Sequence, residues 1–436
     1  MWDNAPKTMP FEIFCQIFRL LCNKPISLHV LDNNSHFDEF PWAVGQVCKG
    51  WREVFLSYPR LWASLSLRYH FTDITCVDCL HEMTRRTLLY LERSGRLPLT
   101  ITVCSITICS TSGGLIEHFP RTTWKLLLSC SERWERADLT LCHGAPIIDL
   151  LRCKMPIIKS LRLQDHGSSV THPYFDLYHP FVAAPRLVEL DLLQVGWLRR
   201  PWVLPWSQLT KVNMPVTDGD FIHSKDLETI LSQLQNVEEL RMCKVAGWGR
   251  SRHRERYRCS SPIRLASLRL LAVPVCLLET LTLLEAPSLE HFWVDSMKEQ
   301  DPEQYSLTFT EELSFFIRRS SCHIRRLTLH NYVYQLLPPL MMLLSSIEEL
   351  CIKMMDASGR DAFFAEHITQ MNDGVCLPNL RELEVTCYRG RDDDETLMTA
   401  VSRLLKTRSE ESRLMSVRCE EVPFEPTRVR MSMSFT

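Results

Sequence analysis

The feature that most constrains the fold is a six-residue motif that recurs along most of the chain. Apolar residues, mostly leucine, occupy its first, fourth and sixth positions. Copies begin at Ile158, Leu187, Leu209, Val237, Leu265, Leu278, Leu289, Ile324, Ile347, Leu380 and Leu414. The alternation in the second half of each copy predicts a short strand with one buried face. Helix-like stretches lie between some copies, such as 227–234 and 396–407, so strands and returning helices stacked in sequence predict a repeat solenoid.

The spacing of these copies is irregular. It runs from 11 to 35 residues, and the copies at Leu278 and Leu289 are too close for two full repeats. Segments 99–104 and 137–142 resemble irregular earlier copies. Four copies have proline two residues ahead, where its fixed φ favours the start of a strand: Pro156, Pro185, Pro287 and Pro378. The pattern is typical of leucine-rich repeats, although the Asn or Cys expected after the last leucine is mostly missing.

We therefore expect an α/β fold. An irregular leucine-rich-repeat solenoid of short parallel strands and helices would cover 99–422, and 423–436 would form a C-terminal tail. Residues 68–98 would form a helical linker, with Val77, Leu80, Met83, Leu88 and Leu91 facing inward. Gly95 and Pro98 would end that helix.

The segment 8–67 predicts a small helical module. Its first helix carries polar residues in one narrow stripe, at Glu12, Gln16, Arg19 and Asn23, and apolar residues nearly everywhere else. A surface helix needs an apolar stripe only about 100° wide. This helix is therefore either buried on two sides of its own domain, or one side is left for a partner. A second helix reaches Trp51 and Phe55, and Pro59 ends it before a further anchor at Trp62.

Three stretches of this module, MPFEIFCQIFRLL, VCKGWREV and PRLW, resemble an F-box. The likeness is greatest to the F-box-like proteins of mushroom-forming fungi. Met9 stands where the family usually has leucine, and the segment between the helices is longer than usual. The resemblance implies a short three-helix F-box that docks onto the Skp-type adaptor of a cullin–RING ubiquitin ligase. It assigns adaptor contacts to Met9, Pro10, Ile13, Ile17, Leu21 and Val47, and the F-box core to Cys48, Trp51 and Trp62. The alternative is a self-contained cap that buries all of its own apolar surface.

In the solenoid, strand positions that flank the buried leucines would line one face of a sheet. As target-binding candidates we select Arg162, Asp191, Arg241, Arg269, Trp293, Arg326, Glu349 and Glu384. Trp293 suits a binding hot spot if it points outward. A strand assignment that is off by one residue would turn it inward. The mixed charges favour a protein ligand over DNA.

Other features argue against several classes of protein. The formal net charge is −2, which favours neither nucleic acid nor a membrane surface as a partner. The 18 cysteines are scattered singly, as in a reducing compartment, so we expect a cytoplasmic or nuclear protein. Cys76 and Cys79 with His81 could suggest zinc, but no second ligand pair follows, and helix packing is the favoured interpretation. We expect no metal or cofactor. An arginine-rich stretch, 250–258, is read as an exposed insertion rather than a binding site.

The sequence contains no phosphate-binding loop and no nucleophile motif. We therefore expect no enzymatic activity. The resemblance implies a substrate-recognition subunit of an SCF-type ubiquitin ligase, with the F-box on the adaptor, and through it a cullin, and the solenoid on a target protein. The alternative is a ubiquitin-independent leucine-rich-repeat scaffold whose F-box-like helices act as a cap. A hydrolase or transferase would need a polar cluster that the sequence does not reveal.

Overall fold

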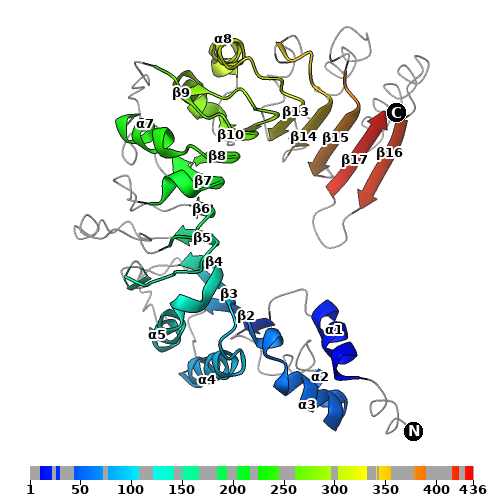
Figure 1. Ribbon diagram of the computed structural model, residues 1–436. Helices are drawn as coiled ribbons and strands as arrows, with labels where there is room; N and C mark the ends of the chain where they lie inside the picture. Colours follow the sequence, from blue (N-terminus) through cyan, green and yellow to red (C-terminus); the bar gives the residue numbers. More distant parts are fainter. Residues whose placement is uncertain are drawn as a thin grey trace. The chain divides into compact units, whose positions relative to one another are not determined.

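In a computed structural model, the chain forms two compact units, Met1–Leu209 and Thr210–Thr436. The structure describes residues 10–21, 26–29, 44–71, 77–107, 121–141, 149–150, 152–165, 184–193, 204–216, 224–244, 261–295, 303–330, 340, 343–354, 377, 379–388, 415–421 and 428–435. Each unit combines helices with parallel strands (Figure 1). This confirms the predicted α/β class with short parallel strands.

The strands of the first unit follow one another in sequence order. They are β1 (Ile26–His29), β2 (Ser64–Phe71), β3 (Leu99–Thr107), β4 (Trp134–Leu141), β5 (Ser160–Asp165) and β6 (Glu189–Leu193). Each pairs in parallel with the next. Leu67, Val103 and Leu163 lie at matching positions and are fully buried. Parallel pairing therefore begins before residue 99, where we had expected the repeat region to start.

Helices and short 3-10 turns complete the first unit. They are α1 (Phe11–Leu21), α2 (Val44–Val47), α3 (Lys49–Ser57), η1 (Pro59–Trp62), α4 (Val77–Arg93), α5 (Arg121–Ser129), η2 (Ser131–Arg133) and η4 (Trp206–Gln208). In α4 the buried stripe runs through Met83, Thr87 and Tyr90. Leu88 is 44% exposed, so its predicted inward position was wrong. It lies about 100° around the helix from Thr87, outside that stripe.

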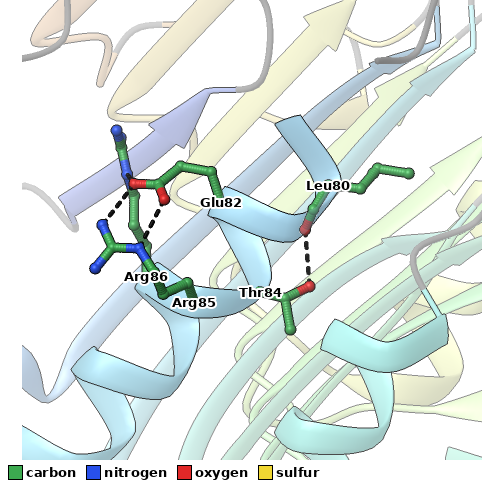
Figure 2. Close-up of polar contacts among 5 residues, drawn as sticks. All are labelled: Leu80, Glu82, Thr84, Arg85 and Arg86. Carbon is green, nitrogen blue, oxygen red and sulfur yellow. Dashed lines mark hydrogen bonds and ion pairs between the residues drawn. The ribbon is translucent and has the colours of Figure 1, made fainter. Parts of the chain in front are cut away.

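Polar contacts order the surface of α4 (Figure 2), and a further one joins it to α5. Arg85 donates to the Glu82 carboxylate at 2.7 Å from both Nε and Nη2, and Arg86 Nε donates to it at 2.8 Å. The hydrogen bonds from Arg85 lower the pKa of Glu82 to about 2. The Thr84 hydroxyl lies 2.8 Å from the Leu80 carbonyl and 2.8 Å from the Thr123 hydroxyl of α5. The helices that follow β2 and β3 are thus packed together through partly buried hydroxyls.

The second unit repeats the same arrangement of strands. In spatial order they are β7 (Lys211–Val216), β8 (Glu239–Lys244), β10 (Leu270–Pro274), β12 (His291–Asp295), β13 (Arg326–His330), β14 (Glu349–Met354), β15 (Glu382–Tyr388), β17 (Arg428–Phe435) and β16 (Met415–Glu421). β7 to β15 pair in parallel, whereas β17 is antiparallel to both β15 and β16. The expected C-terminal tail therefore contains a paired strand.

The remaining elements of this unit lie between those strands in sequence. They are α7 (Ser224–Gln233), η5 (Val275–Leu283), α8 (Glu303–Ser320) and a separate parallel pair, β9 (Ile263–Arg264) with β11 (Leu284–Glu285). The motif copy at Leu278 falls within η5 and is not a strand. Its leucines are buried because they pack from a 3-10 helix. The strong apolar content of this segment explains the false match.

A tight turn precedes many of the strands. In it, the backbone N–H of the motif's first apolar residue donates to the carbonyl three residues earlier. Examples are Ile158 to Met155 at 3.3 Å, Leu187 to Ala184 at 3.2 Å and Leu289 to Ala286 at 3.3 Å. Proline follows the acceptor residue in these three turns, at the position where its fixed φ suits such a turn. These prolines therefore lie in the turn that precedes each strand, not at the first residue of the strand.

The same turn explains an error of register at the motif copy that begins at Leu265. The Leu268 N–H donates to the Leu265 carbonyl at 3.3 Å, so Leu265 is the first residue of the turn. Leu271 then pairs with Leu240 in the sheet. The true strand is shifted three residues along the chain, because LASL is a turn with two buried leucines.

Candidate protein-binding surfaces

The N-terminal helices are held together by an aromatic cluster. Phe14 and Phe18 of α1 are buried and meet the Trp51 ring of α3 edge-on, with centroids 5.7 and 5.4 Å away. Aromatic pairs in this geometry contribute about 0.5–1.5 kcal/mol beyond the area that they bury. One side of α1 is therefore fully used in packing against α3.

The start of α3 depends on Cys48 and Gly45. Cys48 has extended backbone angles, and its sulfur accepts from the Trp51 backbone N–H at 3.5 Å. Arg52 Nε donates to the Gly45 carbonyl at 2.7 Å. A Cβ added at Gly45 would lie 3.3 Å from the Phe55 ring, so a small residue fits best there. Cys48 thus acts as a helix cap that fixes the direction of Trp51.

Trp62 joins this helical module to α4. Its side chain is 1% exposed, and its indole N–H donates to the Phe55 carbonyl at 3.1 Å. The rings of Phe55 and Tyr90 each lie 4.8 Å from it, and the Arg93 guanidinium lies 4.5 Å from its ring centroid. Trp51 and Trp62 therefore serve different junctions, the first between α1 and α3 and the second between α3 and α4.

The opposite side of α1 is apolar and uncovered. Ile13 is 42% exposed and Leu20 is 72% exposed, while Ile17 between them is half-buried. Their spacing of four and three residues places them in one stripe on the helix. Val47, at the end of α2, is 59% exposed. We name Ile13, Ile17 and Leu20 the α1 stripe.

The structure describes some, but not all, of the residues that the F-box resemblance selected for adaptor contact. Pro10 is exposed and accepts hydrogen bonds from the next turn, at 3.1 Å from the Ile13 N–H. Met9 and the side chain of Leu21 lie outside the described residues. The sequence reasoning missed Leu20, although its spacing of seven residues from Ile13 would have indicated it.

In the first unit, the sheet face opposite the buried leucines carries an ion ladder. Register places Asp138, Arg162 and Asp191 side by side on β4, β5 and β6. The Arg162 guanidinium lies 3.9 Å from the Asp138 carboxylate and 3.4 Å from that of Asp191. Burial raises the pKa of Asp138, and Arg162 opposes that shift. The predicted residues Arg162 and Asp191 therefore neutralise each other.

The corresponding face of the second unit, which we call the open face, carries Trp293 at its centre. Phe292 and Val294 on either side of it are fully buried, so Trp293 points to the opposite face of β12. Its neighbours in register are Ala272 on β10 and Thr328 on β13, both small. Of the two orientations left open by the sequence, the outward one is therefore observed. The indole is half-buried, and its Nε1 has no hydrogen-bond partner in the described part of the chain.

Two cations reach the Trp293 ring from strands on opposite sides of β12. Arg241 Cζ, from β8, lies 4.9 Å from the ring centroid, and Lys353 Nζ, from β14, lies 5.6 Å from it. Ala272 separates Arg241 from Trp293 in register, whereas Lys353 is in register with His330 and reaches the ring diagonally. Cation–π contacts of this kind contribute about 0.5–1 kcal/mol at exposed sites.

The shift of register at β10 removes one candidate from this group. Arg269 precedes the strand, and its carbonyl accepts from the backbone N–H groups of Glu290 and His291 at 3.0 and 2.9 Å. Ala272 occupies the position beside Arg241 that we had assigned to Arg269. The prediction that Arg269 flanks a buried leucine on this face was therefore wrong, because LASL is a turn.

His291 lies beside this group. Its Nε2 is 2.9 Å from the Thr328 hydroxyl. Burial, followed by the charges of Arg326, Arg241 and Lys353, lowers its pKa to about 4, and Glu239 only partly opposes them. The imidazole is therefore neutral at neutral pH.

The acids of the open face are mostly engaged with cations. Arg326 lies 3.4 Å from the Glu349 carboxylate. Glu239 lies 3.2 Å from Lys211 and 3.8 Å from Arg241. Asp295 lies 3.0 Å from His330 Nδ1. Glu384 on β15 lies beside Cys351 in register. Arg241, Trp293, Arg326, Glu349 and Glu384 thus lie on one continuous face.

A groove of about 560 Å³ lies where strands β12 to β15 begin. Its lining includes Glu290, Arg325, Glu348 and Arg381, from successive strand starts. Glu348 lies 4.0 Å from Arg325 and 3.7 Å from Arg381. Because these charges alternate in sign and pair with one another, the groove has no marked preference for ligands of one charge.

The described residues offer little for bond chemistry. No three His, Cys, Asp or Glu side chains among them gather as a metal site would require. Cys76 is outside the described residues, as is the Cys79 side chain. Burial raises the pKa of both Cys322 and Cys351 to about 11, which keeps these thiols protonated and poorly nucleophilic. Within the described ranges, no helix is long and apolar enough to cross a membrane.

The chain matches no protein-family model, and a search of curated proteins finds no similar sequence. Arguments about function therefore depend on the two surfaces themselves, the α1 stripe and the open face.

Proposed function

We propose that this protein is a substrate-recognition subunit of an SCF-type ubiquitin ligase. Its N-terminal helices act as an F-box on a Skp-type adaptor, and its strand repeats act as a leucine-rich-repeat solenoid that holds a target protein. The chain itself performs no bond chemistry in this proposal. It raises the effective concentration of a target lysine near the ubiquitin thioester of a partner enzyme.

The α1 stripe is the observation that carries the proposal. A helix that served only its own module would bury its large apolar side chains, yet Ile13 and Leu20 are 42% and 72% exposed. Val47 adds another exposed apolar side chain. Exposed aliphatic side chains at helical spacing are typical of surfaces that a partner covers. The F-box resemblance assigns two residues of this stripe, Ile13 and Ile17, to the adaptor contact.

The second candidate function is a scaffold that acts without the adaptor, with the helices as a cap. The contacts of Trp62 favour it, because its ring packs against Tyr90 of α4 and so ties the helical module to the sheet-bearing part of the first unit. A cap needs such a junction. It does not need the exposed leucine at position 20, which is why we prefer the ligase subunit.

Binding of the full chain to a purified Skp-type adaptor, measured by pull-down and calorimetry, tests the proposal. The test variant is Ile13→Asp/Leu20→Asp, with both changes in the α1 stripe. The matched control is Leu88→Asp, because Leu88 is 44% exposed on α4 and lies outside the stripe. We expect the wild type and the control to bind, and the stripe variant to lose binding while keeping its circular dichroism spectrum.

Failure of the wild type to bind the adaptor would reject the ligase proposal in favour of the scaffold. Equal binding by the wild type and the stripe variant would reject the α1 stripe as the contact. A stripe variant that unfolds would indicate that the stripe is part of the module's core. In that case the milder change Leu20→Gln, at the more exposed position, decides between the two.

A further inference from the structure

Trp293 lies at the centre of the open face, with its indole half-buried. Its neighbours in register are the small residues Ala272 and Thr328, and the His330 ring lies edge-on to the indole at 6.3 Å. The part of the indole that remains exposed is an apolar surface held in a fixed orientation on a strand. Such residues carry most of the energy in protein–protein contacts.

The cations at this ring are held in place. Arg241 is positioned by Glu239 on its own strand and by the indole face. Lys353 also contacts the indole, and among the described residues it has no ion pair with a carboxylate. A cation already oriented by an aromatic ring loses less conformational entropy when it binds an anion.

The charges that act on His291, two residues from Trp293 on β12, are mostly positive, although the whole chain is slightly acidic. Burial is the main cause of the low pKa of His291, and the charges of Arg326, Arg241 and Lys353 add to it, while Glu239 opposes them. The nearby carboxylates of Glu239, Asp295 and Glu349 each lie within 4.0 Å of a basic group. The face therefore offers one apolar anchor with positive charge on both sides of it.

We propose that the open face around Trp293 binds an acidic peptide segment of a partner protein. Aspartate or glutamate carboxylates of that segment lie beside Arg241 and Lys353, and its apolar atoms cover the indole. Charge complementarity selects the occupant. A nucleic acid would bring phosphates to the same two cations, so an oligonucleotide is one of the comparison probes. This inference deepens the proposed function, since it names the chemistry of the target segment, but its test needs no adaptor.

The test is fluorescence anisotropy of a labelled peptide in which glutamate alternates with glycine, titrated with the full-length protein. The comparison probes are the same peptide with glutamine in place of glutamate, the same peptide with phosphoserine in place of glutamate, and a single-stranded oligonucleotide. We expect the glutamate peptide to bind at least about tenfold more tightly than its glutamine counterpart, and binding to weaken as salt rises.

Protein variants assign the binding to this face. Trp293→Ala should weaken binding of the glutamate peptide by about thirtyfold, as expected for an interface hot spot. Arg241→Gln/Lys353→Gln removes the two charges and keeps much of the side-chain volume, so it serves if Trp293→Ala fails to fold. The matched control is Arg264→Ala, which removes an exposed arginine of β9 in the same unit. The control should bind like the wild type.

Three results would overturn the inference. They are equal binding of the glutamate and glutamine peptides, unchanged binding by the folded charge variant, and Trp293-dependent binding of only the phosphoserine peptide or the oligonucleotide. The outcome is independent of the ligase proposal. Peptide binding without adaptor binding would reject the proposed function alone, and adaptor binding without peptide binding would reject this inference alone.

Discussion

In each unit, the sheet face opposite the buried leucines is built from strands paired in parallel. The side chains on that face differ between the two units. In the first unit, Asp138, Arg162 and Asp191 on adjacent strands form a ladder in which one cation lies between two acids. In the second unit, the equivalent row places Arg241, then Ala272, then Trp293. The first face satisfies its own charges, while the second surrounds an aromatic ring with cations from strands two positions away.

This difference shows that different residues of each strand determine the buried leucine rows and the opposite face. Leu163 in the first unit and Leu327 in the second are both 0% exposed. The interior is thus the same kind of structure in both units. The opposite faces are free to differ, because their side chains contribute little to that interior, and so they determine what each unit can bind.

The largest predicted effect tests the shared interior. Leu163→Ala and Leu327→Ala should each lower the free energy of unfolding by about 2–5 kcal/mol, because each leaves a cavity in a fully buried row. Urea denaturation measures the loss. A cost below about 1 kcal/mol in one unit alone would contradict the statement that the two interiors are alike.

The second prediction concerns pH and the second unit. His291 has a folded-state pKa of about 4, below its ordinary value of 6.5. The unfolded chain therefore takes up the proton first, and stability falls as pH decreases from 6.5 towards 4. Burial is the largest cause of this lowered pKa, the charges of Arg326, Arg241 and Lys353 add to it, and Glu239 opposes it. We expect the contribution to be on the order of 1 kcal/mol.

The measurement is the urea midpoint at neutral pH and at about pH 5, for the wild type and His291→Gln. The variant should show a smaller pH dependence than the wild type. If both lose the same stability on acidification, His291 is not held neutral by its surroundings, and the positive character of the open face is in doubt.

The third prediction breaks the ladder of the first unit. Arg162→Glu places three carboxylates in adjacent positions and should destabilise the protein by about 0.5–1 kcal/mol, since like charges opposite each other repel. NMR titration should also show that the pKa of Asp138 rises further, because Arg162 now lowers it. An unchanged Asp138 pKa would mean that the ladder does not act as an electrostatic unit.

The smallest effect lies on the surface of α4, outside both faces. Glu82→Gln removes the carboxylate shared by Arg85 and Arg86 and should cost no more than about 0.5 kcal/mol, since exposed helix pairs contribute little. Thermal denaturation at low and high salt measures it. The difference in stability between the wild type and the variant should disappear at high salt. A large difference that salt does not change would indicate a loss of packing instead.

The strand pattern was the most predictable part of the molecule. Strands lie at the motif copies of Ile158, Leu187, Leu289 and Ile324, because alternation of apolar residues directly reflects a one-sided sheet. The copies at Leu265 and Leu278 predicted strands at the wrong positions, because buried leucines also occur in turns and 3-10 helices. The copy at Leu414 forms β16, but in an antiparallel pair, and a single motif carries no information on strand direction.

The candidate surfaces were less predictable. Trp293 could be placed outward only when the burial of its chain neighbours Phe292 and Val294 was known. The contribution of Lys353 depends on its contact with the Trp293 ring from two strands away, between residues 60 positions apart in the chain. Leu20 was missed because the F-box resemblance drew attention to Leu21, and exposure is a property of the folded helix.

Hydrogen exchange of the full chain, measured by mass spectrometry with and without a Skp-type adaptor, tests the central claim most directly. That claim is that the N-terminal helices and the open face are separate binding surfaces. The account predicts slower exchange in the backbone amides of α1, α2 and α3 when the adaptor is added, and unchanged exchange in β12, β13 and β14. Protection confined to the strands around Trp293, or no protection anywhere, would contradict it.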